Sequence, residues 1–350
     1  MSKKERDSGL ELLRILALLV TFWMHGASSY RNNEVSAWLC IVIETIGNVG
    51  VPIFILISGY FGIRLKPKKM IQLDLMLIFY CWTGLALRFA WGDAAEYGME
   101  QILSYVLPVI GRNSWYFTCY FALAILSPFL NEFVEKLEKE TFRRMLVLML
   151  VIFSGITTFL FFDITQDGGK GIVNMTLLYL IGRYIRLYQD KKVYSRKKLI
   201  TAYVAIMAVC IALNGALYVV SGTVQNRFSR DNTLFTIAAS VCLFLLFKDL
   251  HFRSKVINRL ATHVPAVFTM EWTLRGVVTA YMFDYLAWRE SNWHELILFG
   301  VCFLLLAMGT VIDELRVLLL GRAEEKLADL EYRGLTTVCG TLKRCILRFF

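Results

Sequence analysis

The chain has 350 residues, 57% of them hydrophobic and 19% charged, and its mean hydropathy is +0.54. This composition is more apolar than that of a soluble globular protein and indicates a membrane protein. The net charge is +10, and the basic residues behind it cluster between the apolar runs. We interpret them as a sign of membrane topology and of contact with anionic lipid, and we do not expect nucleic-acid binding. The eight cysteines form no CxxC pair and no Cys/His ligand spacing, so neither disulfides nor a metal site are predicted.

The first apolar run, residues 10–30, contains three ionisable residues, Glu11, Arg14 and His25. On a helix Arg14 and His25 differ by only about 20° around the axis and lie about 16 Å apart along it. An ionisable group in hydrocarbon costs several kcal/mol, so this polar line is predicted to face a protein-lined or watery interior. In the competing interpretation, Glu11 and Arg14 cap the helix end and His25 bonds a neighbouring helix. Because many apolar runs follow, we interpret this one as a retained first helix and not a signal peptide.

Ten apolar segments are long enough to be transmembrane helices. The second is interrupted by Gly47, Gly50 and Pro52, and such breaks survive where protein or water covers the freed backbone groups. A further segment, 96–110, is too short and polar to span and is predicted to lie on the outer surface. The ten predicted spans are 10–30, 36–62, 71–90, 114–131, 144–162, 171–188, 199–220, 232–248, 262–286 and 295–319.

The distribution of basic residues predicts the orientation. With the N-terminus in the cytoplasm, 29 of the 38 Lys and Arg residues lie in inner segments, six lie in outer segments, and the other three lie within spans. This asymmetry is typical of a multi-pass plasma-membrane protein with both termini inside. We therefore predict an all-α membrane protein of about ten transmembrane helices over residues 1–320, followed by a short, basic, amphipathic tail, 321–350, on the inner leaflet.

Two stretches resemble the acyltransferase-3 family of integral membrane O-acyltransferases. The first is Arg14, ten residues and His25, in a form similar to the branch of Gram-positive polysaccharide acetyltransferases. The second runs from Gly50 to Gly62 as Gly-Val-Pro-Ile-Phe-Ile-Leu-Ile-Ser-Gly-Tyr-Phe-Gly. The resemblance covers about residues 6–320. Weaker matches are 66–69, 115–116, 128–131, 179–186 and 312–316.

One position departs from the family pattern. Many relatives have a histidine near the end of a Tyr-Leu-Ile-His stretch, where this chain has Phe268-Thr-Met-Glu271. Glu271 and Arg275 are four residues apart, in the orientation that favours pairing on a helix. We favour a buried structural ion pair for Glu271 over a direct role in the site, since an unpaired charge at this depth is costly.

The resemblance implies transfer of an acyl group, usually acetyl, from cytoplasmic acyl-CoA to a hydroxyl of an envelope polysaccharide or lipid-linked glycan. Neutral imidazole titrates near working pH, so His25 is the predicted general base. Arg14, positioned by Glu11, is predicted to hold the donor phosphate or carbonyl. Acyl-CoA is expected as a substrate, with no permanently bound cofactor, and direct transfer is favoured over an acyl-histidine intermediate.

Four further residues are candidates for the acceptor side or for a cavity wall: Ser58, Tyr60, Arg112 and Trp115. For Ser58 close helix packing is the favoured role, and Tyr60 and Trp115 are predicted as interface or cavity aromatics. Catalytic roles are not predicted for the other histidines, 251, 263 and 294. Two functional alternatives remain: a glycan or small-molecule transporter that uses the Arg14–His25 line as its path, and an inactive acyltransferase-like scaffold. The oligomeric state is left open.

Overall fold

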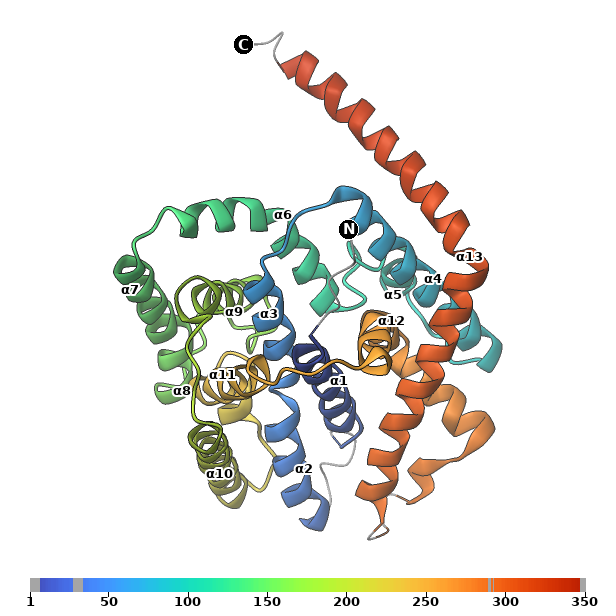
Figure 1. The fold of residues 1–350 in the computed structure, drawn as a ribbon. Coiled ribbons are helices and arrows are strands. Elements are labelled where there is room, and N and C mark those ends of the chain that lie inside the picture. Colours follow the sequence, from blue (N-terminus) through green and yellow to red (C-terminus); the bar gives the residue numbers. More distant parts are fainter. Residues whose placement is uncertain (1–6, 28–33, 289–290, 292, 347–350) are drawn as a thin grey trace.

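In the computed structural model, residues 7–27, 34–288, 291 and 293–346 are described, and they form a bundle of α-helices (Figure 1). About 80% of the chain is helical, and the described residues contain no strand. The prediction of an all-α membrane protein is therefore confirmed. Seven helices are long and apolar enough to cross a membrane: Gly9–Ala27, Ala37–Phe61, Pro67–Trp91, Trp115–Glu135, Lys139–Phe159, Arg196–Ser221 and His294–Thr337.

Helix α1 (Gly9–Ala27) lies at the centre of the bundle (Figure 1). Leu18 and Phe22, beside the polar line, and Leu13 and Leu19, away from it, are all buried, so the helix is enclosed by protein over much of its circumference. A polar line on such a helix meets other side chains and internal space instead of lipid. The helices packed against α1 are α2 (Glu34–Gly47), α3 (Gly50–Phe61), α11 (Leu234–Lys248), α12 (Lys255–Val277) and α13 (His294–Ile346).

Two glycines of the Gly50–Gly62 stretch allow α3 to approach its neighbours closely. A β-carbon on Gly50 would lie 2.1 Å from the hydroxyl oxygen of Thr21 on α1. A β-carbon on Gly59 would lie 2.2 Å from the carbonyl oxygen of Tyr179 on α9 (Ile172–Tyr184). Any larger residue at either place would push the helices apart, so this stretch fixes α3 between α1 and α9.

Three of the ten predicted spans are helices that fall short of a full apolar span. Helix α11 has 15 residues, and α9 has 13 before it continues as a π-helix, Ile185–Gln189. Helix α12 carries Glu271 and Arg275 and continues into a further π-helix, Val278–Met282. Nearly all of α9 is buried, so its backbone and polar groups are covered by protein and need no full bilayer length. The count of ten spans and the orientation of the termini stay predictions.

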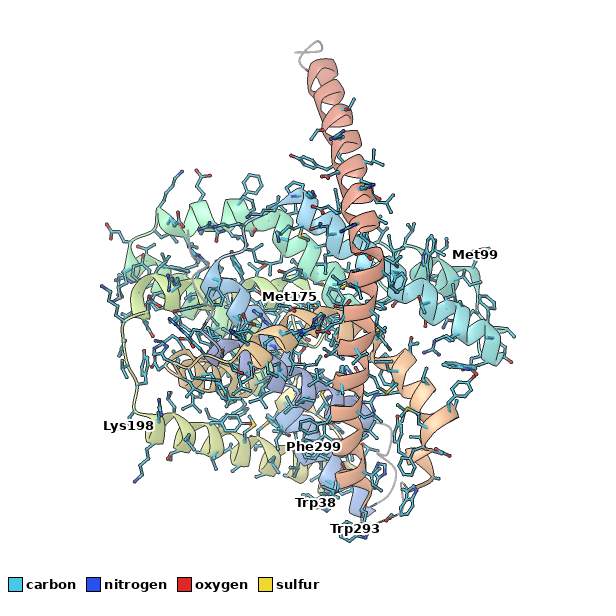
Figure 2. The ribbon with its side chains drawn as sticks, turned by 45° about the vertical axis from the view of Figure 1, so that its right-hand side comes forward. Trp38, Met99, Met175, Lys198, Trp293 and Phe299 are labelled. Atoms are coloured by element: carbon cyan, nitrogen blue, oxygen red, sulfur yellow. The ribbon has the colours of Figure 1, made fainter. Side chains whose placement is uncertain are left out.

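The remaining helices surround this centre. They are α4 (Pro67–Trp91), α6 (Trp115–Glu135), α10 (Arg196–Ser221), and α7 (Lys139–Met149), which runs through a π-helix (Leu150–Gly155) into α8 (Ile156–Phe159). The predicted surface segment 96–110 contains the short helix α5 (Met99–Val106), none of whose residues is buried. Trp38 and Trp293 are exposed at the end of the bundle away from the projecting part of α13 (Figure 2), where an aromatic belt is expected.

The last helix, α13, is one element of 53 residues, about 80 Å long at 1.5 Å per residue. It extends well beyond the other helices (Figures 1 and 2). The tail that the sequence predicts as a separate segment from residue 321 is helical and continuous with the last span as far as Ile346. Lys68, at the start of α4, ties the continuation to the bundle through Asp329 at 2.7 Å and Glu325 at 3.5 Å.

Candidate active site

His25, in the last turn of α1, is bonded to Glu271 of α12. Its Nδ1 lies 2.7 Å from Glu271 Oε2. An ionised carboxylate accepts a hydrogen bond and cannot donate one, so it selects the tautomer with the proton on Nδ1 and leaves Nε2 as the basic nitrogen. The His25 side chain is 28% exposed and the Glu271 side chain only 2%, so the imidazole can be reached by a ligand while its partner is shielded.

Glu271 is held in turn by Arg275, one helical turn further along α12. Arg275 Nε donates to Glu271 Oε1 at 3.0 Å, and a second guanidinium nitrogen donates to the Phe22 carbonyl of α1 at 2.5 Å. The ion pair predicted from the i, i+4 spacing is therefore present, and it also orients His25. Trp272 stacks on the imidazole at 5.7 Å between ring centroids, which limits rotation of the ring.

Three cavities follow one another along α1, and we name them by position. The N-terminal cavity, at the start of α1, has a volume of about 520 Å³. The middle cavity has about 350 Å³, and the His25 cavity has about 270 Å³. Arg14 lines both the N-terminal and the middle cavity, while Phe117 and Phe268 line both the middle and the His25 cavity. The three spaces thus form a row from Arg14 to His25.

The boundary between the middle cavity and the His25 cavity is aromatic. Phe117 of α6 and Phe268 of α12 meet edge to face with ring centroids 5.9 Å apart. Tyr116 also contacts Phe268, at 5.6 Å. Aromatic rings in edge contact can move aside by side-chain rotation. This pair therefore narrows the passage between the two cavities without closing it permanently.

The N-terminal cavity carries most of the charge. Arg186 donates to both carboxylate oxygens of Asp190 at 3.0 Å, and its side chain is 48% exposed. Lys248 also lines the cavity, next to Asp249 at 2.6 Å. At the rim, burial alone would raise the pKa of Asp7, but hydrogen bonds from His251 and the Gly9 backbone hold that pKa below its ordinary value. An anionic ligand would meet several cations here.

The His25 cavity has a different lining. Trp115 and Trp272 supply flat apolar surfaces, and Asn113 and Thr269 supply neutral hydrogen-bonding groups beside the His25–Glu271 pair. Flat rings combined with neutral donors and acceptors suit a ligand that has both apolar and hydroxyl faces.

The other predicted site residues are distributed over the whole row. Glu11 accepts from Arg14 at 2.5 Å, a contact that both the positioning role and the competing helix-end interpretation predict. Ser58 lines the middle cavity, and its hydroxyl donates to the Phe54 carbonyl at 2.8 Å. Tyr60 lines the N-terminal cavity and bonds Asp190, so it lies far from the acceptor side. Arg112 is exposed and has a φ of +58°. The next residue in the chain, Asn113, lines the His25 cavity.

Some site residues were not identified from the sequence. Arg186 lies in the weaker match 179–186, but only the fold shows that it shares a cavity with Arg14. Phe268 lies three residues before Glu271, where the chain departs from the family pattern. Nothing in the sequence indicates that Phe268 lies between two cavities. His263 is buried and bonds Asp313 at 2.6 Å, in agreement with a structural role. The described residues hold no group of three or more His, Cys, Asp or Glu side chains that could share a metal ion.

The described residues thus form a helical membrane bundle with an internal row of cavities that ends at a His–Glu pair. Residues 7–312 match the acyltransferase-3 family, whose model is described as an acyltransferase domain. The match covers most of the chain, so the chain belongs to this family and is a membrane acyltransferase by class. No curated protein and no solved structure matches the chain.

Proposed function

We propose that this protein transfers an acyl group, acetyl in the simplest case, from cytoplasmic acyl-CoA to a hydroxyl of a cell-surface polysaccharide or its lipid-linked precursor. The observation that carries the proposal is the row of cavities between Arg14 and His25, with the imidazole held by a buried carboxylate at its far end. A donor and an acceptor can approach the same imidazole from opposite ends of such a row.

The donor end is assigned to the N-terminal cavity. Coenzyme A is polyanionic, and Arg14, Arg186 and Lys248 are the cations that line this cavity. A guanidinium matches phosphate geometry through paired hydrogen bonds, so the half-exposed Arg186 and the cavity-sharing Arg14 are suited to the phosphates. The flexible, uncharged pantetheine arm, with its two amides, then follows the middle cavity, whose walls include Phe54, Ser58 and Tyr120.

The chemistry is assigned to His25. Its Nε2 accepts the proton of the acceptor hydroxyl as that oxygen attacks the thioester carbonyl carbon. The tetrahedral intermediate collapses by breaking the carbon–sulfur bond, and the proton held by the imidazole passes to the departing thiolate. The products are the ester and free coenzyme A. Glu271 stabilises the transient imidazolium and keeps its orientation, while Arg275 prevents Glu271 from turning away.

The acceptor end is assigned to the His25 cavity. Sugar rings present apolar C–H faces that stack on aromatic side chains and hydroxyls that bond neutral polar groups. Trp115 and Trp272 provide the first kind of surface, and Asn113 and Ser114 provide the second. These features support a carbohydrate acceptor, and the Gram-positive polysaccharide branch suggested by the first-helix motif agrees with this choice.

The test begins with mass spectrometry of the envelope glycan from cells with and without the protein. Loss of one ester-linked acetyl group is the expected result. Complementation with His25→Ala should fail, and complementation with Lys198→Ala, an exposed position on α10, should succeed. Membrane levels of all three forms are compared by immunoblot. Restoration of the ester by His25→Ala at normal membrane levels would refute the assignment.

The same experiment separates the transporter alternative. A transporter of glycan would leave the pattern of esters unchanged and reduce the amount of exported glycan. Purified protein with acetyl-CoA and a polysaccharide acceptor gives the complementary result, since only an acyltransferase forms ester and releases free thiol. Thiol release that depends on both substrates is therefore the decisive signal.

A further inference from the structure

The loop between α8 and α9 has an unusual order of oxygen-bearing residues. It reads Asp163-Ile-Thr165-Gln-Asp167-Gly168-Gly-Lys-Gly-Ile-Val-Asn174. Side-chain oxygens occupy the first, third, fifth and twelfth positions, glycine occupies the sixth, and a helix begins at the tenth. This is the spacing of helix-flanked calcium loops, with asparagine in place of the usual final glutamate.

The side chains of the loop converge in space. Thr165 Oγ1 lies 2.9 Å from Asp163 Oδ1 and 2.9 Å from Asp167 Oδ1. Neighbouring oxygens that each lie about 2.4 Å from one calcium ion are separated by about 2.8–3.3 Å, so these three have ligand-like spacing. Gly168 has a φ of +62°, which lets the chain turn here, and its N–H donates to Asp163 Oδ2 at 2.8 Å.

Two buried amide oxygens at the same place have no hydrogen-bond donor among the described residues. They belong to Asn174, 5% exposed, and Asn232, 2% exposed, in the loop before α11. The nitrogen ends of these amides touch the loop: Asn174 Nδ2 lies 3.0 Å from the Gly169 carbonyl oxygen and Asn232 Nδ2 lies 3.2 Å from Asp163 Oδ1. A half-turn of each amide exchanges its two ends and directs the unsatisfied oxygens at the loop.

We propose that the 163–171 loop, closed by Asn174 and Asn232, binds a calcium ion. The donors are two carboxylates, a hydroxyl, a backbone carbonyl at Gly169 and two amide oxygens. A set of six all-oxygen donors from an irregular loop suits Ca²⁺ better than Mg²⁺, which requires a small and regular octahedron. Only two of the six donors are ionised. The site therefore differs from a cluster of three or more His, Cys, Asp or Glu side chains, and the described residues hold no such cluster.

The surroundings set the expected affinity. Lys170 lies within the loop, and the side chain of Arg230 passes beside Gly168, so two cations oppose a divalent ion. With two carboxylates against two nearby cations, the dissociation constant is expected at about 10⁻⁴–10⁻³ M, the range of extracellular calcium modules. A bound ion would join the loop before α9 to the loop before α11, where Asp231 lies within electrostatic reach of His25.

Thermal unfolding of the purified full chain in detergent tests the site without any activity measurement. The protein is first treated with EGTA and then titrated with CaCl₂ or MgCl₂ to about 10 mM, well above the expected dissociation constant. Calcium should raise the midpoint by at least about 2 °C, and magnesium should raise it less. No calcium-dependent rise, or an equal rise with magnesium, overturns the proposal and leaves the proposed function untouched.

Variants locate the effect. The double variant Asp163→Asn, Asp167→Asn should lose the calcium-dependent rise, and Asp93→Asn, at an exposed turn after α4, should keep it. Asn174→Asp adds a carboxylate at the twelfth position, so it should lower the calcium concentration at half-effect by about tenfold. If the double variant does not fold, Asn174→Asp still decides: an unchanged half-effect concentration overturns the site, as does a calcium response retained in a folded double variant.

Discussion

The two ends of the row of cavities are built on different principles. The N-terminal cavity is wide, about 520 Å³, and its arginines are partly exposed and can change partners. The His25 cavity is about half that size. Its His25–Glu271 pair is fixed by Arg275, which bonds Glu271, and by Trp272, which stacks on the imidazole. Solvated cations suit the capture of a mobile charged group, whereas a fixed hydrogen-bonded pair suits a reaction step.

This contrast predicts how substitutions divide. Changes at the N-terminal cavity should act mainly on the KM for acyl-CoA, because they alter the capture of the donor. Changes at the His25 cavity should act mainly on kcat, because they alter the transition state. Each prediction below tests this division, and the effects decrease in size from one to the next.

Removal of the imidazole is expected to have the largest effect. His25→Ala should lower kcat by about 10²–10⁴-fold, the usual contribution of a positioned general base. Initial rates of thiol release with purified protein measure the loss, and Lys198→Ala serves as the matched surface control. Rates within a factor of about three of the wild type would remove His25 from the mechanism.

Loss of the charge that orients His25 should have the next largest effect. Glu271→Gln keeps the shape of the side chain but leaves Arg275 without its carboxylate, so kcat should fall by about 10–100-fold. The KM for acyl-CoA should stay within about twofold, and Glu271→Asp should recover part of kcat. Glu96→Gln, on an exposed turn, is the control. An increase in KM without a decrease in kcat would contradict the assigned position of Glu271.

Arg14→Ala should show the opposite pattern. Loss of one charged hydrogen bond to the donor, about 1.5–3 kcal/mol, corresponds to an increase of about 10–100-fold in KM. Arg14→Lys keeps the charge but not the paired geometry, and should lie between the wild type and Arg14→Ala. Steady-state kinetics over a range of acyl-CoA concentrations provide the measurement. A loss confined to kcat would move Arg14 from donor capture to the reaction step.

The aromatic boundary should give the smallest change. Phe268→Ala widens the passage between the middle and His25 cavities, so butyryl-CoA should become a better donor relative to acetyl-CoA, by about tenfold. Competition between the two donors, followed by mass spectrometry of the ester, measures this ratio. Phe129→Ala, on an exposed part of α6, should leave the ratio unchanged. An unchanged ratio in Phe268→Ala would mean that donor length is determined elsewhere.

The sequence predicts the positions of most helices and misses helix ends that polar residues extend. Helices α4, α6 and α10 lie within a few residues of their predicted spans, because hydropathy reports contact with lipid directly. Helix α11 and helix α9, with its π-helical continuation to Gln189, also lie within two residues of their predicted spans. Helix α12 begins at Lys255, seven residues before its predicted span, because its polar first turns carry no hydropathy signal. Helix α13 continues past residue 321 because good helix formers follow and Gly321 alone does not stop it.

Within the candidate site, spacing along one helix could be predicted and contacts between helices could not. Arg14 and His25 share the inner side of α1 because both lie on one helix, where 3.6 residues per turn relates them. The bond between His25 and Glu271 joins residues 246 positions apart, and no local pattern encodes it. Ser58 and Tyr60 are two residues apart on α3, so they point in nearly opposite directions and line different cavities.

The length of α13 has a mechanical consequence. A hydrocarbon layer is about 30 Å thick, whereas α13 is about 80 Å long along its axis and bends where it leaves the bundle (Figure 1), so much of its length lies outside the part that crosses the layer. The helix stays unbroken through this bend, and Lys68 of α4 holds it at Asp329, so the direction of its far end depends on both the last span and α4. A change in the angle between these two helices would therefore move the far end of α13 or break the ion pair.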